Sequence, residues 1–163
     1  VNGALSMTKK VLMVCLGNIC RSPTAAGIMT QKVYARGLSD RIIVDSCGTA
    51  DYHIGAPADP RTIKAAADRG YDLRPHRARQ LKLSDFDTFD LILAADAANA
   101  KDIAKMRYSR PHPGKAQVRL FLDILWPGEG KAIPDPYYGG TDGFETVIDL
   151  CEQGAKAWVA KLQ

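Results

Sequence analysis

Residues 11–24 read VLMVCLGNICRSPT. The first six are apolar and fit a short strand that is buried on both faces of a sheet. Gly17 and Asn18 interrupt the apolar run, and Ser22-Pro23 is typical of a helix start, with Ser22 as N-cap and Pro23 at the first helical position. The stretch therefore predicts a strand, a tight loop and a helix in succession.

The same alternation continues to the end of the chain. Further strands are expected at 41–46, 89–95 and 118–122, and further helices at 59–70 and 97–106. A last helix is indicated by an apolar stripe made of Phe144, Val147, Ile148, Cys151, Ala155, Trp158, Val159 and Leu162. The prediction is one α/β domain with a four-stranded parallel sheet and helices on both faces, flavodoxin-like or Rossmann-like, with a phosphate loop after the first strand.

Composition and charge narrow the function classes. The chain of 163 residues is 46% apolar and 25% charged, which is typical of a single soluble domain. Its net charge of +4 is spread along the chain, so no nucleic-acid partner is expected. The densest basic stretch, 74–79, fits either a solvated loop or a rim for an anionic ligand. His53, His76 and His112 stand apart from other metal-ligating residues, so we expect neither metal nor cofactor.

The N-terminus and the hydropathy suggest a location. No apolar run approaches the roughly 20 residues of a membrane-spanning helix, and no signal peptide is visible. We therefore expect a cytoplasmic protein without a membrane partner. Met7 is a candidate natural start, residues 1–8 are interpreted as an extension or remnant, and 9–163 as the functional domain.

The loop 15–22 is the first candidate for a functional site, because ligands of open parallel sheets bind at the carboxyl ends of the strands. Its backbone N–H groups and the following helix N-terminus can converge on an anion, and the planar guanidinium of Arg21 matches phosphate oxygens. Such donors favour the thiolate of Cys15, and Ser22 can donate a hydrogen bond to its sulfur. The Cys-x5-Arg spacing is weak by itself, and it gains meaning from the strand, the glycine and the Ser-Pro helix start around it.

Residues 11–24 closely resemble the signature of low-molecular-weight protein tyrosine phosphatases. Five further segments resemble the same family in the same order: 45–49, 55–61, 76–80, 86–96 and 135–138. The resemblance extends essentially from Lys9 to the C-terminus. The resemblance implies a metal-independent phosphatase that dephosphorylates phosphotyrosine in proteins through a phosphocysteine intermediate.

The resemblance assigns three catalytic roles. Cys15 is the implied nucleophile, Arg21 holds the phosphate oxygens, and Asp135 acts first as general acid and then as base for water. Asp135 is also distinctive by itself, because Pro134 and Pro136 stiffen it in an extended loop.

Supporting roles follow from the same resemblance. The implied phosphate-binding loop comprises Leu16, Gly17, Asn18, Ile19, Cys20 and Ser22, and Asn18, Ser46 and His76 form its implied supporting network. The implied substrate slot is lined by Tyr52, where relatives often have Trp, and by Tyr137 and Tyr138. Cys20 is interpreted as a redox guard that traps an oxidised Cys15 as a disulfide, whereas Cys47 and Cys151 are expected in the core.

Other activities of the same fold remain open. Phosphoarginine phosphatases tend to have Thr where this chain has Ile19, which disfavours that substrate. Arsenate reductases need further redox cysteines near the third strand, and residues 91–106 contain none. A module that binds phosphotyrosine or another anion without turnover would not need Cys15, Arg21 and Asp135 together.

Overall fold

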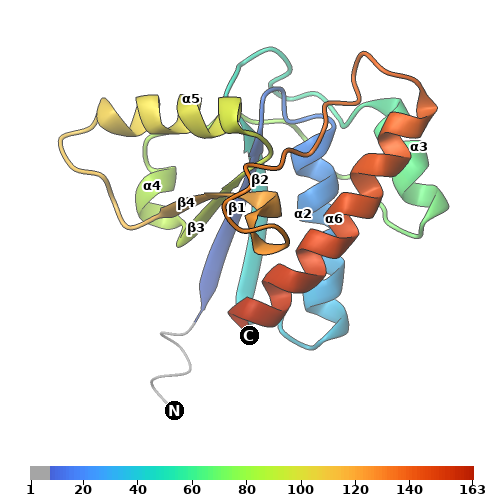
Figure 1. The fold of residues 1–163 in the computed structure, drawn as a ribbon, viewed down its shortest axis with the longest axis horizontal. Helices are drawn as coiled ribbons and strands as arrows, with labels where there is room; N and C mark the ends of the chain where they lie inside the picture. Colours follow the sequence, from blue (N-terminus) through green and yellow to red (C-terminus); the bar gives the residue numbers. More distant parts are fainter. Residues whose placement is uncertain (1–7) are drawn as a thin grey trace.

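Four strands form a parallel sheet in the computed structural model, which describes residues 8–163 (Figure 1). They are β1 (Lys9–Cys15), β2 (Ile42–Gly48), β3 (Leu91–Ala94) and β4 (Gln117–Leu120), and their order in the sheet is β2-β1-β3-β4. In the register, Val11 of β1 lies opposite Val44 on one side and Leu91 on the other. The predicted α/β architecture with four parallel strands is confirmed. The interpretation of residues 1–8 as an extension falls almost entirely outside the described residues.

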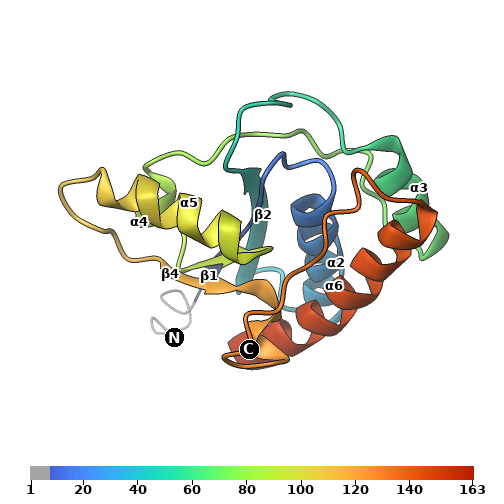
Figure 2. The same ribbon diagram turned by 45° about the horizontal axis from the view of Figure 1, so that its top comes forward.

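Helices cover both faces of the sheet (Figures 1 and 2). α2 (Arg21–Ala35), α3 (Pro60–Asp68) and α6 (Thr141–Leu162) lie on one side, and α4 (Asp85–Thr88) and α5 (Ala97–Tyr108) on the other. A 3₁₀ turn, η1 (Phe121–Ile124), follows β4. The sequence interpretation missed α4 and η1 because four residues are too few to show a helical period. None of the helices in residues 8–163 has the length and apolarity that crossing a bilayer requires.

The start of α2 differs from the prediction. The helix begins at Arg21 with Cys20 at the N-cap position, and no side chain caps it. Ser22 is therefore inside the first turn, and its hydroxyl lies 3.0 Å from the sulfur of Cys15. Pro23 fits there because N–H groups of the first helical turn have no partner within the helix. Ser22 as N-cap was wrong because its hydroxyl is engaged by the loop instead.

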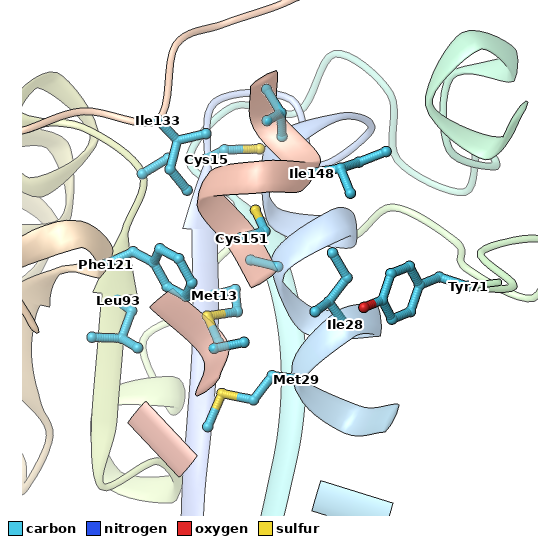
Figure 3. Close-up of a cluster of buried hydrophobic side chains, with 14 of the residues drawn as sticks. Met13, Cys15, Ile28, Met29, Tyr71, Leu93, Phe121, Ile133, Ile148 and Cys151 are labelled. Carbon is cyan, nitrogen blue, oxygen red and sulfur yellow. The ribbon is translucent and has the colours of Figure 1, made fainter. Parts of the chain in front are cut away.

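The core consists of two apolar clusters, one on each face of the sheet. Side chains alternate along a strand, so Val11 and Met13 pack into the cluster under α2 and α6, and Leu12 and Val14 into the cluster under α5. Figure 3 shows the first cluster, in which Cys151 of α6 lies among the apolar side chains below Cys15. The predicted stripe of α6 is buried except for the partly buried Leu162, and Cys47 and Cys151 are core residues as expected.

Candidate active site

A pocket of about 270 Å³ opens at the carboxyl end of the sheet. Its wall comes from three segments: the loop between β1 and α2, the loop after β2, and the segment before α6, which run close together in both views (Figure 2). The residues that line it are Cys15, Leu16, Gly17, Ile19, Cys20, Arg21, Tyr52, His53, Asp135, Tyr137 and Tyr138. The loop predicted from residues 15–22 therefore meets Asp135 and all three predicted tyrosines in one pocket.

The sulfur of Cys15 lies in this pocket and is surrounded by hydrogen-bond donors. The backbone N–H of Asn18 donates to Cys15 Sγ at 3.3 Å, and Ser22 Oγ lies 3.0 Å from it. Because Asn18 Nδ2 donates to Ser22 Oγ at 2.8 Å, the hydroxyl proton of Ser22 can point at the sulfur, and the carbonyl oxygen of Cys47 at 3.3 Å is its alternative acceptor. Such donors stabilise a negative charge on sulfur.

Asn18 lies behind the loop and connects it to its surroundings. Its side-chain amide also donates to Ser46 Oγ at 3.0 Å and accepts from the backbone N–H of Arg79 at 3.0 Å. Its backbone has a φ of 58°, the left-handed conformation, which asparagine tolerates better than most residues. Asn18, Ser22 and Ser46 are buried and do not line the pocket, so they hold Cys15 from the protein side.

His76 supports the same loop. Its Nε2 lies 2.7 Å from the carbonyl oxygen of Asn18, which can only accept, so Nε2 carries the hydrogen. Burial lowers the pKa of His76, although the hydrogen bond to Asn18 opposes this shift. Both observations indicate that His76 is a neutral imidazole that donates a hydrogen bond to the loop.

Arg21 spans the floor of the pocket. Its side chain is only 5% exposed, and Nη1 donates to Asp96 Oδ2 at 2.7 Å and to the carbonyl of Ile133 at 3.0 Å. Nη2 lies 3.8 Å from Asp135 Oδ2, so the guanidinium lies beside the predicted acid. The carboxyl of Asp135 is 41% exposed, and its Oδ1 accepts the backbone N–H of Tyr137 at 3.0 Å.

Aromatic rings form the rim of the pocket. Tyr137 and Tyr138 meet edge to face with ring centroids 4.9 Å apart, and the His53 ring lies 6.4 Å from both Tyr52 and Tyr137. Tyr52 and Tyr138 are exposed and stand at the mouth. The rim therefore offers flat apolar surfaces above a floor that carries the Cys15 sulfur and the Arg21 guanidinium.

The sequence interpretation did not select two residues of the site, one behind the pocket and one in its wall. Asp96 holds Arg21, and it also caps α5 by accepting the N–H of Asn99 at 2.7 Å. Asp96 follows β3, and β3 is the neighbour of β1 in the sheet. Because ligands bind at the carboxyl ends of parallel strands, this position could have identified Asp96 as a site residue. His53 follows Tyr52 and lines the pocket, and its lone position in the sequence gave no such signal.

The basic stretch 74–79 contributes no residue to the pocket lining. Arg74 pairs with Asp72, and Arg79 pairs with Asp45 and Asp85. These arginines are engaged by carboxylates, which agrees with a solvated loop better than with a rim for an anionic ligand.

The remaining cysteines differ from Cys15 in their surroundings. Burial raises the pKa of Cys20 to about 12 and also raises the pKa values of Cys47 and Cys151. Their thiols therefore stay protonated near neutral pH. All four cysteines are free thiols in this structure, and the disulfide between Cys15 and Cys20 stays a prediction. Within residues 8–163, no three His, Cys, Asp or Glu side chains are grouped so that they could hold a metal ion.

Comparison with known proteins gives the family. The family model described as "Low molecular weight phosphotyrosine protein phosphatase" matches residues 10–163. A protein of that name from Schizosaccharomyces pombe is 45% identical over 141 residues, which cover 85% of this chain and 88% of the relative. Among solved structures, a protein tyrosine phosphatase from Entamoeba histolytica superposes with a TM-score of 0.85 at 37% identity, covering 95% of this chain and 97% of the other. A drosophila arginine phosphatase superposes with a TM-score of 0.87 at 29% identity, covering 93% and 96%. This chain belongs to the low molecular weight phosphotyrosine protein phosphatase family.

Proposed function

We propose that this protein hydrolyses phosphotyrosine in phosphoproteins, with Cys15 as the nucleophile. The observation that carries the proposal is the convergence of three groups in one pocket: a cysteine sulfur that accepts hydrogen bonds, the buried guanidinium of Arg21 and the carboxyl of Asp135. Membership of the family supports the same conclusion.

In the first step, the Cys15 thiolate attacks phosphorus, so that an S–P bond forms while the P–O bond to the leaving group breaks. Asp96 and Ile133 accept hydrogen bonds from Nη1 of Arg21, whereas its Nε–H and Nη2 groups form no hydrogen bond within residues 8–163 and can bind the phosphate oxygens. Nη2 lies 3.8 Å from Asp135 Oδ2, so a bound phosphate would lie beside the proposed acid. Asp135 gives its proton to the leaving oxygen. In the second step, Asp135 takes a proton from water, the water oxygen attacks phosphorus, and the thiolate and inorganic phosphate are released.

The rim favours an aromatic phosphoester. Tyr52, Tyr137 and Tyr138 can contact a phenyl ring whose phosphate reaches the floor, whereas the short side chain of phosphoserine would leave these rings without a partner. Phosphoarginine is the second candidate, because a close structural relative is an arginine phosphatase. Ile19, which lines the pocket, argues against that substrate by the resemblance described above. The chemistry requires a reduced Cys15, so we further propose that the protein acts in a reducing compartment such as the cytoplasm.

Turnover of matched peptides that carry phosphotyrosine, phosphoserine or phosphoarginine tests the proposal. We expect the phosphotyrosine peptide to have the highest kcat/KM, and a preference for phosphoarginine would replace the proposed substrate class. Cys15→Ser should abolish turnover and still bind oxyanions.

Asp135→Ala tests the proton donor. A general acid contributes about 10²- to 10⁴-fold, and it matters most when the leaving group is a poor one. We expect kcat/KM for phenyl phosphate to fall by about 10²-fold or more, and that for p-nitrophenyl phosphate to fall far less. Equal losses on both substrates would contradict the role of Asp135.

A further inference from the structure

The start of α3 lies between the phosphate loop and the segment that carries Asp135. Asp59 is the N-cap of α3, and its backbone N–H donates to the carbonyl oxygen of Ile19 at 2.9 Å. The carboxyl of Asp59 is 8% exposed. The first turn of α3 is therefore attached directly to the loop that surrounds Cys15.

Asp59 holds the guanidinium of Arg61 in one orientation. Arg61 Nε donates to Asp59 Oδ1 at 3.0 Å and Nη2 donates to Oδ2 at 2.8 Å, and the Arg61 backbone N–H donates to Oδ1 at 2.9 Å. This two-pronged contact fixes the plane of the guanidinium, which a lysine ammonium cannot reproduce. The hydrogen bonds from Arg61 also lower the pKa of Asp59, so the carboxyl stays ionised.

The fixed guanidinium contacts two aromatic rings. Its central carbon lies 5.5 Å from the ring centroid of Tyr137 and 4.9 Å from that of Phe144. Both distances fall within the range of cation–π contacts. Phe144 is a buried residue of α6, whereas Tyr137 belongs to the pocket wall and donates its backbone N–H to Asp135 Oδ1. Arg61 thus joins the phosphate loop, α6 and the Asp135 segment.

The Asp135 segment is held differently on its two sides. Before Asp135, the backbone of Ile133 donates to Ala95 and accepts from Arg21. After Asp135, buried Pro136 packs near α3 and α6, and Tyr137 contacts Arg61. A cation–π contact at such a partly exposed site is strong enough to bias the position of one side chain and too weak to determine the fold.

We propose that Arg61 is a positioning residue for the general acid: it holds the ring of Tyr137 and thereby keeps the Asp135 carboxyl at the pocket. The inference rests on the proposed role of Asp135. Arg61 itself does not line the pocket, so it acts through Tyr137 and not on the substrate.

The leaving-group dependence of kcat/KM tests this inference, because kcat/KM reports the steps up to P–O cleavage. In Arg61→Met, we expect kcat/KM for phenyl phosphate to fall about ten-fold, as a misplaced proton donor would cause, and that for p-nitrophenyl phosphate to fall less than about two-fold. Arg61→Lys keeps the charge without the planar fork, so its loss on phenyl phosphate should lie between those of wild type and Arg61→Met.

Arg69→Met is the matched control. Arg69 follows α3 at its other end and pairs with Glu145, Asp149 and Glu152 of α6. Arg69→Met therefore removes an arginine that bridges α3 and α6, and within residues 8–163 Arg69 forms no ion pair with Asp135 and no cation–π contact with Tyr137. We expect its leaving-group dependence to equal that of wild type. A uniform loss on all substrates in Arg61→Met would show a merely structural role and overturn the proposal.

The double variant Asp135→Ala/Arg61→Met separates the inference from the function on which it rests. If Arg61 acts through Asp135, the double variant should show the same leaving-group dependence as Asp135→Ala. A steeper leaving-group dependence in the double variant than in Asp135→Ala would overturn the role of Arg61 and leave that of Asp135 intact. If Asp135→Ala itself leaves the dependence unchanged, the acid assignment fails and the inference fails with it.

Discussion

Asn18 shows how one residue can organise the surroundings of a cysteine sulfur. Its backbone N–H contacts the sulfur of Cys15, its side-chain amide contacts Ser22 and Ser46, and its carbonyl accepts from His76. The left-handed conformation costs a non-glycine residue about 1–2 kcal/mol, and the hydrogen bonds of the amide offset this cost. Glycine would adopt the same backbone conformation, but it would lack the side-chain amide that contacts Ser22 and Ser46.

The four cysteines should differ in reactivity. At pH 7, a thiol whose pKa is about 12, such as that of Cys20, is ionised to a fraction on the order of 10⁻⁵, and burial protects Cys47 and Cys151 in the same way. Because donors surround the sulfur of Cys15, limiting iodoacetate should carboxymethylate that residue first, as measured by peptide mass spectrometry. In Cys15→Ser, labelling should be at least about ten-fold slower. Equally fast labelling of Cys20 would contradict this expectation.

At the scale of elements, α6 connects the core to the site. Its apolar stripe packs on α2 and on η1, and the indole Nε1–H of Trp158 donates to the carbonyl of Phe121 at 2.7 Å. The segment just before α6 carries Asp135 and the two rim tyrosines. The packing of α6 therefore sets where that segment ends, whereas the hydrogen bonds of Ile133 to Ala95 and Arg21 hold its start.

The packing of α6 on η1 requires a glycine at position 154. A Cβ there would lie 2.3 Å from Phe121 Cε2 and 2.7 Å from Cζ. We expect Gly154→Ala to destabilise the fold by about 1–3 kcal/mol through overpacking, although alanine favours a helix by about 1 kcal/mol. Urea unfolding followed by tryptophan fluorescence measures the change.

Gly143→Ala is the matched control in the same helix. There a Cβ would meet Pro136 Cβ at an ordinary 3.4 Å, so the helix preference of alanine should leave stability unchanged or raise it by up to about 1 kcal/mol. Equal stability of the two variants would show that contact with Phe121 does not limit the packing of α6.

At the scale of the whole molecule, the sheet brings together segments that are far apart in the chain. Parallel strands all end at one edge, so the loops after β1 and β2 and Asp96, two residues after β3, meet there. The Asp135 segment lies beside them (Figure 1). A bound anion would contact several of these segments at once. Ligand binding and global stability should therefore be linked.

Phosphate or vanadate should raise the midpoint of thermal unfolding. A ligand at 100 times its Kd adds about 2.7 kcal/mol, which corresponds to roughly 5–10 °C for a chain of this size. The shift should persist in Cys15→Ser, which keeps Arg21 and the loop N–H groups, and should be lost in Arg21→Met. Chloride at matched ionic strength is the control, and an equal shift with chloride would show that the anion does not use this pocket.

Local features of the sequence were sufficient to predict most of the secondary structure and the loop after the first strand. Apolar runs, together with Gly, Pro and Asp at their ends, predicted the four strands and the four longer helices. The loop after the first strand contains Cys15, Arg21 and Ser22, and Ser22 lies against the Cys15 sulfur seven positions before it in the chain. These relations depend on neighbours in the chain, where spacing translates directly into geometry. The cap of α2 was wrong because the hydroxyl of Ser22 had a competing partner in the sulfur.

The sequence by itself therefore determined the fold class, and it predicted the anion loop and, through its resemblance to a family, the proposed acid Asp135. Only the tertiary structure decided what holds these groups in place: Asp96 against Arg21 across 75 residues, His76 against Asn18 across 58, and Arg61 against Tyr137. Hydrogen bonds and cation–π contacts require groups to approach within a few ångströms in a given orientation. For residues so far apart in the chain, strand order and helix packing decide whether their side chains meet. Their spacing in the sequence does not.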